Sequence, residues 1–352
     1  MKRTYPTTFL AIATAVVTTI SGCANSTGQG ANARNSSNVE VSALECDRDL
    51  TPEDVLNFPV PKANERYQIT FLVISLAGYY YNAEVSGAQL AAEKAGVDVS
   101  VVAAQGFSTA PEQITQAENA LTRGTDAIVL NPVDVNASAP IIDMAKRRGV
   151  PTIVVGTLVD TDDAAQVVQD DYLQGQAAAD ALAARLPDGG KGIVMAGPAN
   201  ATWSVGRTQG FLDRVGEKYP NITVTAVANS NVDPGEGLAK FTNAASSNPA
   251  VDWIYPVYNG LLPPDSIPAH YRNAVLVTGG LDPSTRGAVG SGKAIVIPDW
   301  PVHTGYIGVA EAVAALNGQA PPKLTCLPSP VVAQADLDSP VGQAQFFPWS
   351  PK

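Results

Sequence analysis

The stretch QITFLVISLAGYYYNAEVSGAQLAAEKAGVDVSVVAA (68–104) decides the fold class of this chain. Two apolar runs within it, 68–76 and 97–104, are rich in β-branched residues and predict buried strands. Between them, 83–95 predicts an Ala-rich helix that ends at Gly96. Buried strands that alternate with helices are typical of a parallel α/β sheet.

The same alternation continues along the chain and starts again near residue 170. Further strands are expected at 126–132, 151–156, 192–197, 222–228, 252–257, 274–279 and 293–299, and further helices at 108–123, 137–148, 173–186, 204–218, 237–246 and 302–317. The segment 260–273 holds three prolines, so we expect a loop or a single turn there. The pattern predicts an α/β protein with two doubly wound parallel-sheet lobes.

The N-terminus predicts export and a lipid anchor. Lys2 and Arg3 precede a short apolar run, 9–20, which is too short to cross a bilayer as a helix. The run leads into ISGC (20–23), which resembles a bacterial lipobox with Cys23 as the lipidated residue. An ordinary signal peptide with an incidental cysteine is the alternative. We therefore expect a lipoprotein signal peptide at 1–22 and a flexible, Asn-, Ser- and Gly-rich tether at 23–45.

Cysteine usage predicts one disulfide. The chain has 3 cysteines, and Cys46 and Cys326 remain once Cys23 is assigned to the anchor. In an oxidising compartment, two remaining cysteines favour a bridge, and two free thiols are the alternative.

Composition and motifs argue against several kinds of chemistry. A net charge of −11 disfavours nucleic-acid binding. The 2 histidines lack metal-ligand spacing, and no G-x-S-x-G motif is present. The string 287–293 nearly matches a phosphate-binding loop, but Ala294 stands where a hydroxyl would bind Mg²⁺. We expect no enzyme, no cofactor, no metal, and no membrane contact beyond the anchor.

Several strings together resemble type I periplasmic solute-binding proteins, the ribose/galactose-binding branch that shares its fold with LacI-type sensor domains. They are FLVISLAGYYYNAEVSGAQLAAEKAG (71–96), RGTDAIVLNPVDVNA (123–137), AKRRGVPTIVV (145–155), DDYLQGQAAADAL (170–182), GRTQGF (206–211) and GKAIVIPDWPVHTGYIGVAEAVAALNG (292–318). The resemblance implies two lobes joined by three hinge strands, with a ligand in the cleft. It places one lobe at 66–169 with 300–325 and the other at 170–299 with 326–340. A signal peptide stands where a repressor would carry its DNA-binding segment, so we do not expect a repressor.

The resemblance also implies ligand contacts from rings and polar groups at the strand ends. The candidates are Tyr80, Tyr81, Asn131, Asp170, Trp203, Arg207, Tyr258, Asn259, Asp282, Asp299 and Trp300. Structural roles are open for several of them. The tyrosines can be core rings, Trp203 a helix staple, Arg207 a salt-bridge anchor, and Asp170 a helix N-cap. The pair 299–300 can be only a hinge turn.

Departures from the sugar-binding pattern leave two functions open. Gly156 and Thr157 stand where sugar binders carry an Asp-Arg pair, Ala77 and Gly78 replace an expected Asn, and Asp299 replaces an amide. Rings around one carboxylate could instead hold a small amine. The 297–313 segment also resembles the TorT-type branch, which binds trimethylamine N-oxide and reports to a sensor kinase.

The first expectation is therefore a monomeric, lipid-anchored protein of the cell envelope that captures a sugar or sugar-like polar solute for an ABC permease. The alternative is an amine or amine-oxide sensor that signals to a membrane histidine kinase. An enzyme built on the same fold is the third possibility and is not expected.

Overall fold

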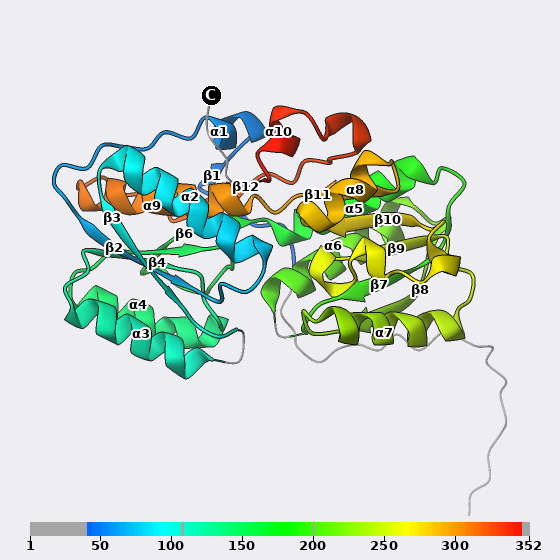
Figure 1. The fold of residues 1–352 in the computed structure, drawn as a ribbon, viewed down its shortest axis with the longest axis horizontal. Coiled ribbons are helices and arrows are strands. Elements are labelled where there is room, and N and C mark those ends of the chain that lie inside the picture. Colours follow the sequence, from blue (N-terminus) through cyan, green and yellow to red (C-terminus); the bar gives the residue numbers. More distant parts are fainter. Residues whose placement is uncertain (1–40, 107–108, 200, 347–352) are drawn as a thin grey trace, which may run out of the picture. The chain divides into compact units, whose positions relative to one another are not determined.

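The computed structural model describes residues 41–106, 109–199 and 201–346. The predicted signal peptide, Cys23 and most of the tether lie outside these ranges. The described chain forms two sheets (Figure 1), one of seven strands in the order β1-β12-β6-β5-β4-β2-β3 and one of five in the order β11-β10-β9-β7-β8. Every pairing within the two sheets is parallel, so the expected α/β fold of two doubly wound lobes is confirmed.

The seven-stranded sheet and the helices packed on it form the first lobe. Its strands are β1 (Arg48–Asp49), β2 (Gln68–Val73), β3 (Asp98–Ala103), β4 (Ala127–Leu130), β5 (Thr152–Val155), β6 (Ala165–Gln169) and β12 (Leu324–Leu327), and its helices are α1 (Pro52–Leu56), α2 (Tyr79–Ala95), α3 (Ala110–Thr122), α4 (Val135–Arg147) and α9 (Pro301–Leu316). Successive residues of β2 face opposite sides of the sheet. Phe71 packs in the core under α2 and α9, and Leu72 in the core under α3 and α4.

The five-stranded sheet forms the second lobe in the same way. Its strands are β7 (Gly190–Ala196), β8 (Ile222–Asn229), β9 (Trp253–Pro256), β10 (Val275–Gly279) and β11 (Ala294–Ile297), and its helices are α5 (Asp171–Arg185), α6 (Thr202–Lys218), α7 (Pro234–Ser247) and α8 (Pro283–Gly290). Helix α10 (Pro340–Gln343) contacts α1 of the first lobe, and its Val341 packs against both cores. Val194 packs with α5 and α6, whereas Ile193 and Met195 pack with α7 and α8. Both lobes therefore bury both faces of a parallel sheet.

One helix pair in each lobe packs backbone to backbone. A Cβ at Gly87 of α2 would lie 1.7 Å from the Val302 carbonyl oxygen of α9. A Cβ at Gly175 of α5 would lie 2.1 Å from the Arg207 carbonyl oxygen of α6. Only glycine fits at such distances, so these residues bring α2 against α9 and α5 against α6 in equivalent ways.

Three chain segments cross between the lobes, following β6, β11 and β12. The Gln169 side-chain amide donates to the Pro298 carbonyl oxygen at 2.9 Å and to Ser329 Oγ at 3.1 Å. The indole N–H of Trp300 donates to the Pro328 carbonyl oxygen at 2.9 Å. Side chains from two of the crossing segments thus bond all three together.

Some elements differ from the sequence predictions. Helix α2 begins at Tyr79, four residues before the expected start, because Gly78 ends the preceding loop at a φ of 104°. Strands β6 and β12 and helix α8 were not predicted, since each is short and lacks a long apolar pattern. Strand β12 pairs with β6, so residues 326–327 belong to the first sheet and not to the second lobe. The proline-rich segment forms short 3₁₀ turns, Asn259–Leu261, Pro264–Ser266 and Ala269–Tyr271.

Cys46 and Cys326 form a disulfide in this structure, with Cα atoms 6.0 Å apart. The bond joins the segment before β1 to β12, and β1 pairs with β12 directly after it. Within the described ranges, no helix has the length and apolar character needed to cross a membrane.

Candidate ligand-binding pocket

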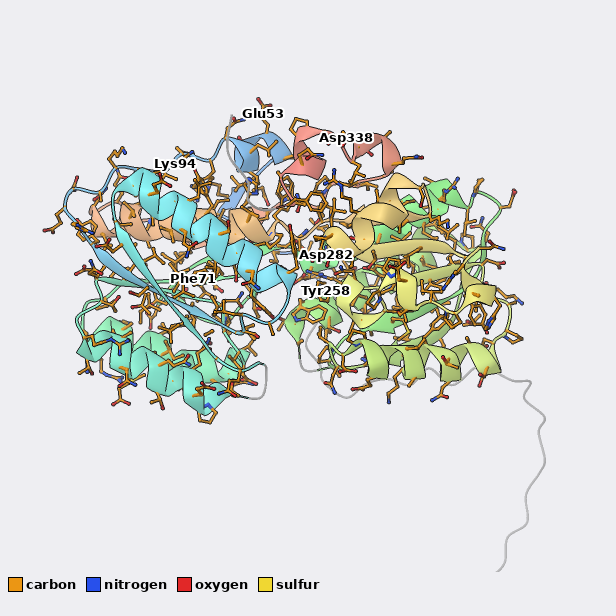
Figure 2. All side chains as sticks on the ribbon, in the orientation of Figure 1. Glu53, Phe71, Lys94, Tyr258, Asp282 and Asp338 are labelled. Carbon is orange, nitrogen blue, oxygen red and sulfur yellow. A yellow bond between two sulfur atoms is a disulfide. The ribbon has the colours of Figure 1, made fainter. Side chains whose placement is uncertain are left out.

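A pocket of about 380 Å³ lies between the lobes, beyond the carboxyl ends of their strands. This is where parallel sheets place their ligand sites. Figure 2 shows Tyr258 and Asp282 on the side of the second lobe that faces the first, whereas Phe71 lies within the first lobe. All predicted ligand residues except Asp170 and Trp300 line this pocket: Tyr80, Tyr81, Asn131, Trp203, Arg207, Tyr258, Asn259, Asp282 and Asp299.

Other lining residues were not predicted as ligand contacts. They are Ile74, Ala77, Gly78, Tyr79, Gly156, Thr157, Val232, Pro234, Gly260, Pro263 and Ser284. Most are small, apolar or proline residues, and they carry no sequence signal beyond their place after a strand.

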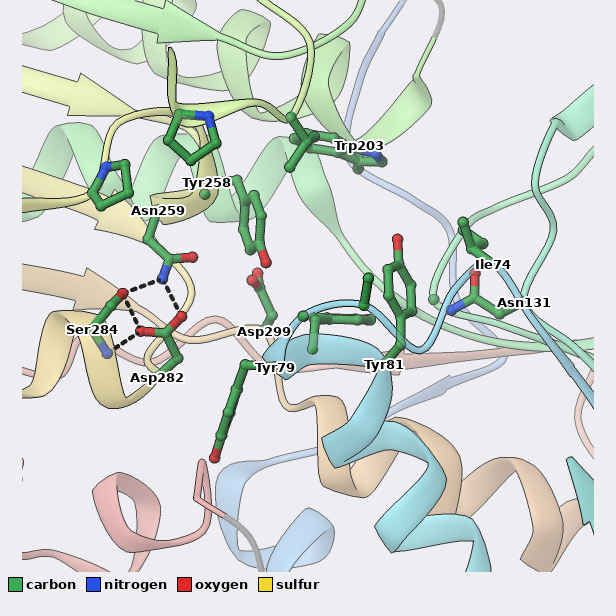
Figure 3. A pocket seen from close by; sticks show the side chains of 18 of the residues that line it. Ile74, Tyr79, Tyr81, Asn131, Trp203, Tyr258, Asn259, Asp282, Ser284 and Asp299 are labelled. Carbon is green, nitrogen blue, oxygen red and sulfur yellow. Dashed lines mark hydrogen bonds between the residues drawn. The ribbon is translucent and has the colours of Figure 1, made fainter. Parts of the chain in front are cut away.

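Aromatic rings from both lobes surround the pocket (Figure 3). Tyr80 and Tyr81 meet edge to face at 5.3 Å between ring centroids, and Trp203 and Tyr258 do so at 6.0 Å. Burial raises the pKa values of Tyr80 and Tyr81 well above the usual 10, and burial also raises that of Tyr258. All three phenols stay neutral, so each can both donate and accept a hydrogen bond.

Arg207 is the centre of a buried charged cluster in the second lobe. It is 7% exposed, and its guanidinium lies 2.8 Å from Asp171 Oδ1 and 3.0 Å from Asp299 Oδ1. It also donates to the Val257 carbonyl oxygen at 3.2 Å, and Gln174 donates to Asp299 at 2.9 Å. Burial raises the pKa of Asp171 to about 6, against the opposing effect of Arg207. The charges of Arg207 and its two carboxylates are therefore largely balanced within the cluster.

The first lobe holds a buried carboxyl group that the sequence reading missed. Glu84 of α2 is fully buried, and the Asn131 amide nitrogen donates to its two oxygens at 3.0 and 2.8 Å. Burial raises the pKa of Glu84 to about 8, although the Asn131 hydrogen bond opposes the shift. A signal did exist, because Glu84 shares a helix face with the buried Gly87, Ala88 and Ala91.

A second amide–carboxylate pair lies on the opposite side of the pocket (Figure 3). The Asn259 amide nitrogen donates to Asp282 Oδ2 at 2.6 Å. Asp282 also caps α8, because its Oδ1 accepts from the backbone N–H groups of Ser284 at 2.8 Å and Thr285 at 3.0 Å. Each lobe thus fixes one asparagine at the pocket with a carboxylate behind it.

Asp170 and Trp300 are not among the residues that line the pocket, and the structure gives each of them another role. Asp170 is the N-cap of α5 and accepts from Leu173 N at 2.9 Å and from Leu44 N at 2.7 Å. Trp300 is fully buried at a φ of 54°, and its ring meets His303 edge to face. Its backbone turn directs the indole toward the crossing segments.

The sequence matches the periplasmic binding protein domain family over residues 69–320. This chain belongs to that family. It is 34% identical over 146 residues to the xylitol-binding protein of Mycolicibacterium smegmatis, which covers 40% of this chain and 41% of that protein. It is 25% identical over 258 residues to the ribose import binding protein of Escherichia coli, which covers 71% of this chain and 85% of that protein.

Solved structures share the fold. A sugar ABC transport substrate-binding protein from Bordetella parapertussis superposes with a TM-score of 0.77 at 22% identity, over 84% of this chain and all of that chain. A carbohydrate transporter solute-binding protein from Agrobacterium radiobacter, bound to D-arabinose, superposes with a TM-score of 0.72 at 24% identity, over 80% and 99% of the two chains. These relatives are binding proteins and not enzymes, as predicted, and they do not favour the sensor alternative.

Proposed function

We propose that this protein captures a neutral sugar or polyol in the pocket between its lobes and delivers it to an ABC permease at the cell envelope, where lipid on Cys23 anchors it. The observation that carries the proposal is the composition of the pocket wall. Rings from both lobes face a space that is also bordered by two fixed asparagines and by the Arg207 cluster. Rings pack on the C–H faces of a polyhydroxy compound, and amide and carboxylate groups bind its hydroxyls.

The state of Asp299 argues for a neutral ligand over an amine. One of its oxygens already lies 3.0 Å from Arg207 and 2.9 Å from the Gln174 amide. A cationic ligand would lie close to Arg207 and compete with it for this carboxylate, so like-charge repulsion would offset much of the gain from the rings.

The relatives support the same choice of ligand class. Xylitol and ribose stand in the names of the two relatives aligned above, one a polyol and the other a pentose. The shared region with the xylitol-binding protein spans less than half of either chain, so we extend the proposal to sugars and polyols alike.

A thermal-shift panel on the purified protein tests the proposal. We expect xylitol, D-ribose or D-arabinose to raise the melting temperature, because a ligand at a hundredfold excess over its Kd stabilises the folded state by about 2.7 kcal/mol. Trimethylamine N-oxide is tested in the same way as the comparison ligand, at the same low concentrations as the sugars and polyols. A shift with the amine oxide and none with any sugar or polyol would reject the proposal in favour of the sensor alternative.

A further inference from the structure

The Glu84 carboxyl group has few hydrogen-bond partners for a buried acid. A carboxylate offers about four acceptor sites, and among the residues that the structure describes, both Glu84 oxygens share the Asn131 amide nitrogen as their hydrogen-bond donor. A leucine would fill this position at the α2–α9 contact at lower cost, since burying a charge is expensive unless it is well paired. Glu84 itself does not line the pocket, but its partner Asn131 does, so this buried acid lies directly behind the pocket wall with few hydrogen-bond partners.

Gly156 leaves space in front of this acid. It follows β5 at a φ of 75°, and it lines the pocket. A Cβ on Gly156 would lie 3.1 Å from Asn131 Nδ2, 3.4 Å from the Tyr80 hydroxyl and 3.5 Å from Glu84 Oε1. Three polar groups, two from α2 and one from the residue after β4, therefore border the same small space beside the pocket.

Asn131 supplies an independent observation. The residue is 2% exposed, and its Oδ1 has no hydrogen-bond donor among the residues that the structure describes. The Glu84 carboxyl holds the nitrogen of this amide, which fixes the orientation of the oxygen. A buried acceptor in a pocket wall is costly to leave unpaired, so a donor group is expected there.

We propose that Glu84 and Asn131 together bind one hydroxyl group of the ligand in the space beside Gly156, and that Glu84 is a specificity-determining residue of the pocket. This assignment rests on the proposed function, because it takes a sugar or polyol as the ligand. The hydroxyl donates to the Glu84 carboxylate and lies beside Asn131 Nδ2, which borders the same space, while Asn131 Oδ1 accepts from a second donor group of the ligand.

The arrangement makes ligand affinity depend on pH. Burial raises the pKa of Glu84 to about 8 in the free protein, so ligand binding, which favours the ionised form, releases a proton below that pH. Affinity rises with pH, by at most tenfold per unit, and levels off above about pH 8.

The titratable neighbours do not mask this change. The phenols of Tyr80 and Tyr81 have pKa values well above 10, and Asp299 and Arg207 act on Tyr80 from the second lobe. On α9, which packs against α2, burial lowers the pKa of His303 to about 3, so it stays neutral.

The experiment compares wild type, E84Q and E311Q in the full chain by calorimetric titration. The probes are xylitol, D-ribose and analogues that each lack one hydroxyl, at pH values from 6 to 9. We expect E84Q to weaken binding of the hydroxylated probe about tenfold or more, which is the usual effect of losing a hydrogen bond to a charged group. We also expect it to abolish the pH dependence and to reduce discrimination against one analogue.

E311Q is the matched control. Glu311 is 3% exposed, and burial raises its pKa to about 7, yet it contacts Arg48 and Thr325 away from the pocket. If E84Q keeps the wild-type affinity, pH profile and discrimination, Glu84 only positions Asn131 and the assignment is overturned while the proposed function stands. If wild type binds no sugar or polyol, the proposed function itself fails, and the assignment with it.

Discussion

Glu84 and Arg207 occupy equivalent positions in the two lobes and meet opposite surroundings. Each lies five residues after the first residue of its helix, Tyr79 in α2 and Thr202 in α6. Each also presents its carbonyl oxygen to a glycine of the neighbouring helix, at 1.9 Å from a Cβ on Gly305 for Glu84 and at 2.1 Å from one on Gly175 for Arg207. One repeated βα framework therefore places a buried charged residue at the pocket end of each lobe.

The difference lies in how each charge is compensated. Arg207 has two carboxylates and a backbone carbonyl around it, so its charge is neutralised within the second lobe. Glu84 has one side-chain amide as its partner, and burial raises its pKa to about 8 against the effect of this hydrogen bond. The comparison teaches that the charge of Arg207 is balanced by protein groups, whereas the proposed ligand contact would supply a partner for Glu84.

Loss of Arg207 is expected to have the largest effect on stability. R207A leaves Asp171 and Asp299 buried without their cation, which should lower the free energy of unfolding by about 3–5 kcal/mol. Urea denaturation measures the change. R214A is the control on the same helix, since the Arg214–Asp180 pair is partly exposed and should contribute about 1 kcal/mol or less. Equal losses in the two variants would show that the Arg207 cluster is not the buried network described here.

Loss of the Glu84 charge is expected to stabilise the free protein. The folded-state pKa of about 8 exceeds the usual 4.5, so the unfolded chain releases this proton first and wild-type stability falls as pH rises from about 4.5 to 8. E84Q does not titrate, so it should gain roughly 2–4 kcal/mol over wild type at pH 8 and little at pH 5.

Denaturation of both proteins at the two pH values measures this gain. The titrations of Asp171 and Glu311 are common to both proteins and cancel in the difference. A gain that does not change with pH would mean that Glu84 carries no buried charge.

Removal of a single aromatic ring is expected to have the smallest effect on ligand binding, and the effect should be similar for a ring of either lobe. Y81A removes a ring of the first lobe and Y258A one of the second, and each should weaken ligand binding by about 1 kcal/mol through lost packing. Calorimetric titration with the sugar or polyol that wild type binds measures the loss. A loss confined to one variant would show that the ligand stacks on only one lobe.

The fold was predictable because apolar strands and Ala-rich helices alternate with little ambiguity. The pocket was largely predictable too, since the ends of parallel strands converge and residues such as Asn131 and Tyr258 follow strands directly. Glu84 was missed because an acid within an Ala-rich helix normally faces solvent, although its helical spacing from Gly87, Ala88 and Ala91 places it on the buried face. Asp170 and Trp300 also follow strands, but a helix cap and a left-handed turn direct them elsewhere.

The glycine contacts within the helix pairs bear on how the molecule uses binding energy. Backbones that touch at Gly87, Gly175 and Gly305 cannot slide without a clash, so each lobe acts as a stiff block. The asparagine, acid and rings of each half-pocket are then ordered before a ligand arrives, and little conformational entropy remains to be lost inside either lobe. If the proposed ligand draws the lobes together, most of the ordering cost of binding would fall on the three crossing segments, which Gln169 and Trp300 bond to one another.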